Sequence, residues 1–494
     1  MDNDSTGRIV EGVRAWIVAA PVGAQLPSTR ALTAQYGASP VTVQRAMRSL
    51  AAQGLIESRP GVGTFVRGRA IARPADHGWQ SAALGPVPSR IATVSATQRV
   101  VAPDAIALHA GYPSPQLLPE RLVRAALTRA ARSGTALERT PAAGLPALQA
   151  WFAAELAAAG SAGAAPAPRD VLITAGSQSA LSSIFGALVG AGRPVLVESP
   201  TYWGAILAAA SHGVTLVPVA SDADGPDPDD LDRAFRQTGA RAFYAQPTYA
   251  NPTGAQWSAE RGLEVLEVVR RHGAFLVEDD WAHDFPIDDE PRPLASADAS
   301  GHVIYLRSLT KSTAPGLRVA AVIARGPARD RLLADRAAES MYVSGALQAA
   351  ALDVVSQPAW RTHLRGVRQQ LRGRRDLLLH SLREHAPLAR IDTVPAGGLN
   401  LWLGLPEGTD VRAFVIECEA RGVVVAAGDE WFPAEPAGPF VRLNFAGREP
   451  ERLPDAARII GEVLEGSREH APLQPPTTRG GPALSRRPPH PSPL

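Results

Sequence analysis

The feature that most constrains the fold is an alternation of short apolar runs with helix-length segments between about residues 102 and 464. Runs that are apolar at consecutive positions are typical of strands buried on both faces of a parallel sheet. The segments between them, such as 178–190, 201–212 and 258–272, are long enough for helices. The alternation predicts an α/β domain with a mostly parallel sheet covered on both faces. The expected strands are Val171–Thr174, Pro194–Glu198, Thr215–Val219, Ala242–Tyr244, Ala274–Glu278 and Val303–Leu306.

Polar side chains that could carry chemistry follow these strands directly. Ligands of parallel sheets bind beyond the carboxyl ends of the strands. One such position holds Lys311, the only lysine among 50 lysine and arginine residues. A lysine amine can lose its proton and attack an aldehyde, whereas the guanidinium of arginine stays protonated. Lys311 could also be a chance survivor in an arginine-rich chain, so its neighbours must decide between the two interpretations.

Three further side chains suit an aldehyde cofactor that contains a pyridine ring. Asp279 follows the Ala274–Glu278 strand, where its carboxylate could keep the pyridine nitrogen protonated and the ring electron-withdrawing. Asn251, in an Asn-Pro-Thr-Gly sequence, could donate its amide to the phenolic oxygen of the ring. Tyr202 offers a flat side chain that could stack on the ring.

A phosphate group on the same cofactor would need backbone N–H groups at a helix start, hydroxyl groups and an arginine. Gly176, Ser177 and Gln178 open a helix after a strand, and Ser308 and Arg318 stand on either side of the lysine. We predict that these five residues bind the phosphate.

Arg442, in the sequence Val-Arg-Leu-Asn-Phe, is the candidate for binding a substrate carboxylate. Taken singly, each of these motifs is more often a helix cap, a turn, a core aromatic or a surface ion pair. Their joint occurrence in this chain order favours a cofactor site. His283 and His302 lie near the motifs but lack the spacing of metal ligands, so no metal site is predicted.

Residues 5–68 show a different pattern, that of three helices followed by a two-stranded wing. Ser28 and Ser39 are suitable N-caps, and Gly37 and Gly54 are suitable helix ends. The first helix is expected to bury Ile9, Val13, Trp16 and Ile17 on one face. The second helix is expected from its cap Ser28 through Tyr36, the third from Val41 to about Gln53, and the two strands at 55–58 and 63–66.

Three stretches of this segment, Gln25–Leu32, Ser39–Val43 and Gly54–Val66, closely resemble the winged helix-turn-helix of the GntR family. The resemblance implies binding to double-stranded DNA. One departure is Pro40, which stands where many members carry an arginine. The implied DNA-binding residues are Ser28 and Arg30 at phosphates, Thr42, Gln44 and Arg45 in the groove, and Gly61 and Gly63 of the wing near the minor groove.

Residues 101–465 resemble the fold-type I pyridoxal-phosphate aminotransferases, close to the subgroup that contains aromatic and 2-aminoadipate aminotransferases. The resemblance implies pyridoxal 5′-phosphate as the cofactor, Lys311 as the catalytic residue and a small C-terminal α+β lobe beside the main sheet. The matching stretches are Gly111–Pro115, Gly144–Leu148, Thr174–Leu181, Asn251–Gly254, Glu278–Asp280 and Ser308–Arg318.

A GntR-type head joined to such a domain is similar to the MocR/GabR family of pyridoxal-phosphate-dependent transcription regulators. The similarity implies a domain-swapped, head-to-tail homodimer. Two departures from the family stand out. Trp281 and Ala282 follow the acidic pair where members often place a tyrosine that binds the cofactor oxygen. Gly204 replaces an arginine of the 4-aminobutyrate-responsive type, so 4-aminobutyrate is not expected as the effector.

Two functions therefore remain open. The first is a DNA-binding regulator that senses an amino compound, or pyridoxal phosphate itself, through imine exchange at Lys311. The second is an active aminotransferase that moves an amino group from an amino acid to a 2-oxo acid and keeps the head as an accessory. The intact head favours regulation.

The composition, 45% hydrophobic and 20% charged with a net charge of +2, is that of an ordinary globular protein. A single cysteine, Cys418, excludes an internal disulfide. No stretch has the length and apolarity of a membrane span, and the acidic N-terminus is unlike a signal peptide, so we expect a cytoplasmic protein. We also expect a linker at 69–100 and a proline-rich disordered tail at 466–494.

Overall fold

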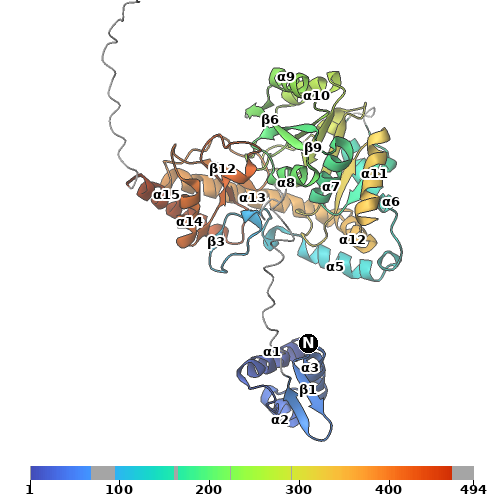
Figure 1. The fold of residues 1–494 in the computed structure, drawn as a ribbon, viewed down its shortest axis with the longest axis vertical. Helices are drawn as coiled ribbons and strands as arrows, with labels where there is room; N and C mark the ends of the chain where they lie inside the picture. Colours follow the sequence, from blue (N-terminus) through green and yellow to red (C-terminus); the bar gives the residue numbers. More distant parts are fainter. Residues whose placement is uncertain (1, 68–94, 161–164, 223, 291, 470–494) are drawn as a thin grey trace, which may run out of the picture. The chain divides into compact units, whose positions relative to one another are not determined.

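The computed structural model describes residues 2–67, 95–160, 165–222, 224–290 and 292–469 (Figure 1). The chain divides into two compact units, residues 1–87 and 88–494. Most of the expected linker, and the expected tail from residue 470 on, lie outside the described residues.

The N-terminal unit consists of three helices and a two-stranded antiparallel sheet. Its core contains Ile9 and Val13 together with apolar residues of every other element. Ser28 and Ser39 cap the second and third helices, as predicted, each by accepting a backbone N–H at 3.2 Å. The elements are α1 (Asp2–Ala19), α2 (Thr29–Tyr36), α3 (Pro40–Ala52), β1 (Ile56–Arg59) and β2 (Gly63–Val66).

One residue of the first helix departs from its predicted burial. Trp16 is 38% exposed, although it was expected on the buried face. Seven residues make nearly two helical turns, so Trp16 lies on the same face of α1 as Ile9, but it is close to the end of the helix, where half-buried Ile17 packs against the core instead.

The second unit is built on an eight-stranded sheet with the order β4-β11-β10-β9-β8-β5-β6-β7. The neighbouring strands from β10 to β6 are parallel, whereas β11 and β7 run antiparallel to their neighbours. The prediction of a mostly parallel sheet is confirmed. The strands are β4 (Val171–Thr174), β5 (Pro194–Ser199), β6 (Thr215–Asp222), β7 (Gly225–Pro226), β8 (Ala242–Ala245), β9 (Phe275–Asp280), β10 (Val303–Ser308) and β11 (Ala320–Ile323).

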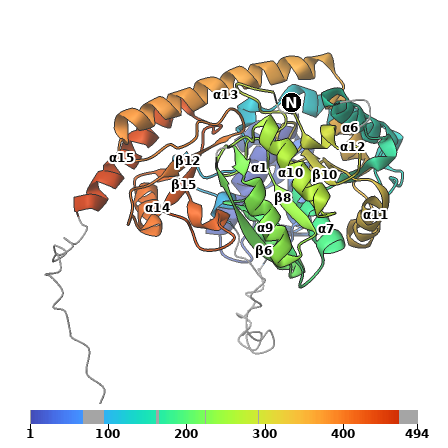
Figure 2. The same cartoon turned by 90° about the horizontal axis from the view of Figure 1, so that it is seen from above.

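Helices cover both faces of this sheet (Figures 1 and 2) and form two separate apolar clusters with it. The first cluster joins the sheet to α5 (Glu120–Ala131), α6 (Pro146–Ala159), α9 (Pro228–Thr238), α10 (Ala259–Arg271) and α12 (Gly345–Val355). The second cluster joins it to α7 (Ser177–Ile184), α8 (Trp203–His212) and α11 (Gly326–Ser340).

Strand β6 is less buried than its apolar sequence predicted. Only Val219 of the expected run 215–219 is buried, because β6 lies near the edge of the sheet beside the two-residue strand β7. The other expected strands are buried along most of their length.

A C-terminal lobe packs around a three-stranded antiparallel sheet with the order β12-β15-β14. The long helix α13 extends from this lobe toward α6 and α12 in Figure 2. Helix α15 continues to Glu469, beyond the position where the tail was expected to begin. The elements are β3 (Ile106–Ala107), α13 (Pro358–His385), β12 (Asn400–Gly404), α14 (Val411–Ala420), β13 (Val423–Val424), β14 (Ala426–Ala427), β15 (Phe440–Asn444) and α15 (Leu453–Glu469).

Candidate ligand-binding site and DNA-binding surface

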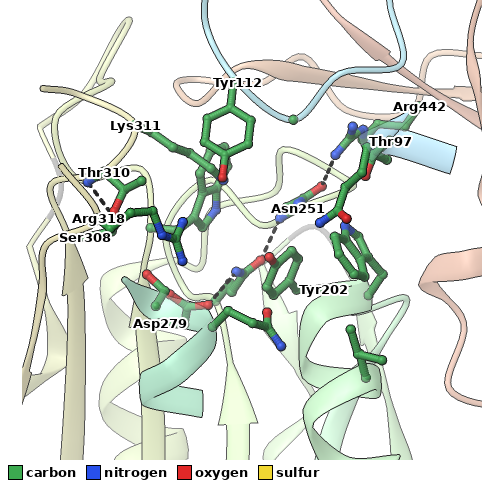
Figure 3. Close-up of a pocket in the computed structure, with 18 residues that line it drawn as sticks. Thr97, Tyr112, Tyr202, Asn251, Asp279, Ser308, Thr310, Lys311, Arg318 and Arg442 are labelled. Atoms are coloured by element: carbon green, nitrogen blue, oxygen red, sulfur yellow. Dashed lines mark hydrogen bonds between the residues drawn. The ribbon is translucent and has the colours of Figure 1, made fainter. Parts of the chain in front are cut away.

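A cavity of about 330 Å³ opens at the carboxyl ends of the parallel strands (Figure 3). It lies between the main sheet and the C-terminal lobe, since β9 and β10 contribute to it from one side and β15 from the other. The structure brings together nearly all the residues that the sequence singled out. The predicted residues lining it are Ser177, Gln178, Tyr202, Asn251, Asp279, Ser308, Lys311, Arg318 and Arg442.

Lys311 follows β10 and is partly buried in the cavity wall. Its Nζ lies 4.0 Å from the ring centroid of Trp281. The loss of water around the amine lowers the pKa of Lys311 to about 7, although the negative charge of Asp279 opposes this shift. A large fraction of the amine is therefore unprotonated, and nucleophilic, near neutral pH.

Asp279 lies on β9 and is only 1% exposed. Its Oδ2 accepts hydrogen bonds from Tyr244 Oη at 2.8 Å and from Gln246 Nε2 at 3.0 Å. Its other oxygen, Oδ1, is buried and has no partner among the described residues. Burial raises the pKa of Asp279 to about 6, while the two donors lower it. A buried carboxylate oxygen without a donor indicates a place where a ligand supplies one.

Gly176 is the predicted site residue that does not line the cavity itself. It precedes α7 with φ +86°, and a Cβ at this position would lie 2.6 Å from Arg318 Nη2. The Arg318 guanidinium donates to the Ala175 carbonyl at 3.1 Å and so lies across the start of the helix. Ser177 is the first residue of α7, and Ser308 faces the same cavity. This arrangement offers a guanidinium, hydroxyl groups and helix N–H groups to an anion.

Gln246 was missed by the sequence analysis. It follows β8 directly, and its side chain donates to Asp279 and accepts from the Asn251 backbone N–H at 2.9 Å. Asn251 Oδ1 in turn accepts from Arg442 Nη1 at 3.1 Å. The dashed lines of Figure 3 trace this connection across the floor of the cavity. Gln246 lies just after a strand, as other site residues do, and this position is the signal that could have identified it.

Arg442 lies on β15 and is 1% exposed. Its Nη2 donates to the His109 carbonyl at 2.7 Å, and its guanidinium carbon lies 4.7 Å from the ring centroid of Trp431. Its Nε has no partner, and no carboxylate of the described chain lies within ion-pair distance of it. Burial lowers the pKa of Arg442 to about 10. A buried guanidinium without a counter-ion is costly, so it is suited to receive a ligand carboxylate.

The predicted DNA-binding residues lie on the N-terminal unit. The side chains of Gln44 and Arg45 are exposed on α3 and make no hydrogen bond to other described residues, and Arg30 is exposed on α2. The Thr42 hydroxyl lies 2.9 Å from the Ser39 hydroxyl, and the Ser28 hydroxyl caps α2. Helix α3 thus presents free amide and guanidinium groups, as a helix that enters a DNA groove does.

The two wing glycines differ in their surroundings. Gly61 has φ +74° and open space around it, so the backbone of the wing tip is accessible. Gly63 has φ +146°, and a Cβ there would lie 2.4 Å from Gln25 Nε2. The close contact with Gln25 thus explains the glycine at position 63 by packing within the unit. At Gly61 the wing backbone is open and could approach another molecule.

Two known protein families match different parts of the chain, and these parts correspond to its two units. The family of bacterial regulatory proteins, gntR family, matches residues 6–66, and the family aminotransferase class I and II matches residues 104–460. The probable rhizopine catabolism regulatory protein MocR of Rhizobium meliloti is 30% identical over 458 residues, which are 90% of this chain and 91% of that protein. The chain belongs to the MocR family. The resemblance inferred from its motifs is confirmed.

Other relatives of this MocR-family chain cover the second unit. The 2-aminoadipate transaminase of Thermus thermophilus is 28% identical over 376 residues, 75% of this chain and 92% of that enzyme. The crystal structure of LysN, an alpha-aminoadipate aminotransferase from the same species, was solved with N-(5′-phosphopyridoxyl)-L-leucine. It matches with a TM-score of 0.69 and 28% identity, over 74% of this chain and 94% of that one.

The aminotransferase fold of the MocR family implies pyridoxal 5′-phosphate as the cofactor, and the cavity fits it. The unpaired Asp279 Oδ1 could accept from the protonated ring nitrogen, and Lys311 could hold the aldehyde carbon. Ser177, Ser308 and Arg318 line the same cavity and would hold the phosphate. No cluster of three or more metal-ligating side chains occurs in the described part of the chain.

Two departures from the family pattern have local explanations. Trp281 lies in the cavity wall next to Lys311, and its Nε1 donates to the Tyr249 carbonyl at 3.0 Å. Its indole therefore presents an apolar ring in the region where many members have a tyrosine hydroxyl. At Gly204 a Cβ would lie 2.4 Å from Gln178 Oε1 and from Tyr202 Cε1, so any side chain here would require both of these side chains to move. None of the described helices is both long and apolar enough to cross a membrane.

Proposed function

We propose that the protein is a pyridoxal-phosphate-dependent transcription regulator, which binds a double-stranded DNA operator and responds to an amino compound or to the cofactor itself at Lys311. The observation that carries this proposal is the combination of units on one chain. The exposed groups of α3 could read DNA, and the cavity that holds Lys311 could bind an amine. MocR of Rhizobium meliloti and YdfD of Bacillus subtilis, which each match 90% of the chain, are named as regulators.

Different cavity residues would bind different parts of the cofactor and of the ligand. When bound, the cofactor supplies an aldehyde that can exchange one amine for another and a ring that withdraws electrons. Lys311 holds it through the side-chain amine and, once displaced, can accept a proton. Asp279 keeps the ring nitrogen protonated, and Arg442 orients the ligand through its carboxylate. A ligand that binds one arrangement of the protein more tightly than another would shift the DNA-bound population.

The test of regulation is DNA binding by the full-length, cofactor-loaded protein. We expect salt-sensitive binding to a fragment from upstream of a divergent neighbouring gene, and much weaker binding to the same fragment with its sequence scrambled. Equal affinity for both fragments at physiological salt would contradict the proposal.

An active aminotransferase is the second candidate, favoured by the predicted cofactor residues that line one cavity and by Arg442, which has no ion-pair partner among the described residues. It predicts many turnovers with an amino donor and a 2-oxo acid. If each protein molecule instead completes a single half-reaction and then stops, the chemistry serves sensing.

The proposal extends to assembly and location. We propose a domain-swapped, head-to-tail homodimer, because family members of this kind assemble so, and a cytoplasmic location, because that is where a bacterial operator is found. Sedimentation equilibrium of the full-length chain tests the assembly, since a monomer at micromolar concentration would exclude it.

A further inference from the structure

The residue after Lys311 connects the lysine to a second part of the chain. Ser312 is 3% exposed, and its Oγ donates to Asp284 Oδ2 at 2.6 Å. The same hydroxyl lies 3.4 Å from the Leu309 carbonyl, so the bond to Asp284 is much the shorter. Thr313, the next residue, instead donates to the Leu309 carbonyl at 2.6 Å, within the turn that follows β10. The bond from Ser312 to Asp284 therefore ties this turn to another segment.

That other segment, which follows β9, also contributes to the cofactor site. Asp279, near the end of β9, lines the cavity and could bind the ring nitrogen. Trp281 lies against the lysine, with its ring centroid 4.0 Å from Lys311 Nζ. Strands β9 and β10 are parallel neighbours, so both segments leave the sheet at the same edge. The bond between Asp284 and Ser312 joins the segment of the carboxylate to the segment of the amine.

Asp284 is itself held through its other oxygen. Arg307 Nη2 donates to Asp284 Oδ1 at 3.2 Å, and both side chains are only 4% exposed. The Arg307 guanidinium also donates to Glu155 at 3.4 Å, and its carbon lies 5.1 Å from the ring centroid of Trp151 on α6. Because both of its oxygens are bonded, Asp284 offers Ser312 an acceptor in a fixed position.

The contacts of Asp284 bear on position rather than on charge. A buried ion pair is weak evidence for stability, since the loss of water around both charges offsets their attraction. The pKa of Lys311 is lowered by burial, and the charges that also affect it are those of Asp279 and Arg442, not that of Asp284. The amine and the Asp279 carboxylate must reach opposite ends of one rigid ring, and a misplacement of about 1 Å can cost about a hundredfold.

We propose that Asp284 is a positioning residue for Lys311, because its bond to Ser312 holds the lysine at the distance from Asp279 that the cofactor ring requires. The step that it assists is the condensation of the amine with the aldehyde carbon, in which a C=N bond forms and water leaves. This role rests on the proposed function only in that pyridoxal phosphate enters the cavity, since it involves neither DNA nor the effector.

The experiment compares two compounds on the full-length protein freed of cofactor. Pyridoxal phosphate can react with Lys311, whereas 4′-deoxypyridoxine phosphate has a methyl group in place of the aldehyde and binds through its ring and phosphate alone. Equilibrium dialysis gives the affinity for each compound. In Ser312→Ala we expect the affinity for pyridoxal phosphate to fall by about tenfold or more, and that for the analogue by less than about twofold. Equal losses for both compounds, or no loss for either, would overturn the inference.

Two variants of Asp284 separate its bond from its charge. Asp284→Ala should repeat the effect of Ser312→Ala, and the double variant should lose no more, because both single variants remove the same bond. Asp284→Asn should keep the wild-type preference, since its amide can accept from Arg307 and donate to the Ser312 hydroxyl. Additive losses in the double variant, or a loss in Asp284→Asn as large as in Asp284→Ala, would contradict the proposed role. Ser312→Ala leaves the ion pair with Arg307 intact, so it decides the question if Asp284→Ala does not fold.

Glu155→Gln is the matched control. It removes the other carboxylate that Arg307 contacts but leaves the bond between Ser312 and Asp284 in place. Both affinities should stay within about twofold of wild type, because Glu155 is a partly exposed partner at a long distance. A loss of the preference for pyridoxal phosphate as large as in Ser312→Ala would assign the effect to Arg307 and overturn the inference.

The proposed function fails by different results. A wild-type protein that binds neither compound would contradict cofactor binding and the role of Asp284 together. A wild type that prefers pyridoxal phosphate, with the same preference in Ser312→Ala, would contradict the role of Asp284 alone. Equal affinity for operator and scrambled DNA would contradict the regulator alone.

Discussion

Lys311 provides the most direct chemical test at the scale of single residues. Because it is the only lysine, the cofactor can be attached to just one side-chain amine of the chain. We expect borohydride reduction of the loaded protein, followed by peptide mass spectrometry, to place the label at Lys311. Lys311→Ala and Lys311→Arg should both lose the visible absorption, since a guanidinium does not react with the aldehyde. Retention of the band in Lys311→Arg would contradict the assignment.

The protonation of Lys311 predicts how cofactor uptake depends on pH. Its pKa is lowered from 10.5 to about 7 by burial, so the amine is mostly neutral at pH 8. An ordinary lysine would be neutral in only about 0.3% of molecules at that pH. The rate of uptake by cofactor-free protein should rise through about pH 7 and then level off. In stopped-flow absorption, a rate that keeps rising to pH 10 would show that the amine is not activated.

Asp279→Asn is the matched variant for this profile. The carboxylate of Asp279 raises the pKa of Lys311, so removing its charge should move the midpoint of the profile to lower pH. A midpoint that moves upward would mean that another group controls the lysine. The amide keeps the size of the side chain, so the comparison isolates charge from packing.

At the scale of elements, the contribution of the start of α7 to cofactor binding can be tested separately from the effect of backbone strain on stability. Gly176 and Gly190 both have φ +86° with ψ near 160°, a region that is essentially restricted to glycine. A Cβ at Gly176 would strike the Arg318 guanidinium, whereas nothing lies within 4 Å at Gly190. Gly176→Ala should weaken cofactor binding by about tenfold or more, the effect of losing one charge-assisted hydrogen bond.

Gly190→Ala provides the control for this prediction. Both variants should lose about 1–3 kcal/mol of unfolding free energy from the strained backbone. Only Gly176→Ala should lose cofactor affinity, measured by equilibrium dialysis of the folded protein. Equal losses of cofactor affinity in both variants would mean that Arg318 does not act at the phosphate.

Helix α3 gives the corresponding prediction for the N-terminal unit. Arg45→Ala should weaken operator binding by roughly 1–3 kcal/mol and relax the sequence preference, if its guanidinium reads a base. Arg30→Ala should weaken binding to all sequences alike and reduce the salt slope by about 1. Arg8→Ala, which removes an exposed arginine on α1, should change neither. Fluorescence anisotropy at several salt concentrations distinguishes these outcomes.

The elements that could be read from sequence were those with strong local signals. Strands β4 and β10 are continuous apolar runs, and the capping serines Ser28 and Ser39 mark helix starts by hydrogen bonds within three residues. Strand β11 was missed, because Ala320–Ile323 is short and its pairing with β4 depends on residues far away in sequence.

The residues of the site likewise differ in whether a local sequence signal or a long-range contact places them. Lys311 and Asp279 follow strands, so topology alone brings them to one edge of the sheet. Thr97 and Gln98, which also line the cavity, carried no such signal, since their place depends on contacts of Ser95 and Arg99 with residues more than 300 positions away, Glu430 and Glu419. Long-range contacts of this kind are not visible in local periodicity.

For the whole molecule, the decisive property is whether the cavity and the DNA-binding unit influence one another. The region matched by the GntR family ends at residue 66, and the aminotransferase match begins at 104. The stretch between them includes Ser95 to Arg99, which contacts both the cavity and the C-terminal lobe. We predict that a ligand in the cavity changes operator affinity through this stretch.

Such coupling must be reciprocal if it exists. If a ligand of the cavity changes the affinity for the operator by some factor, the operator must change the affinity for that ligand by the same factor. We expect a factor of about 5 to 150, typical of coupled sites. Anisotropy of labelled DNA gives the first factor, and titration of the visible absorption with and without DNA gives the second. A ligand that binds without changing operator affinity would identify the cavity as an enzyme site rather than a sensor.

Ser95→Ala tests whether the segment after the linker carries this coupling. The variant removes the hydrogen bond to Glu430 but leaves the cofactor residues and α3 unchanged. Both coupling factors should fall toward one together, while operator affinity without ligand stays the same. If both factors are unchanged in Ser95→Ala, ligand binding reaches the head by another route, because reciprocity holds whichever contacts transmit the effect.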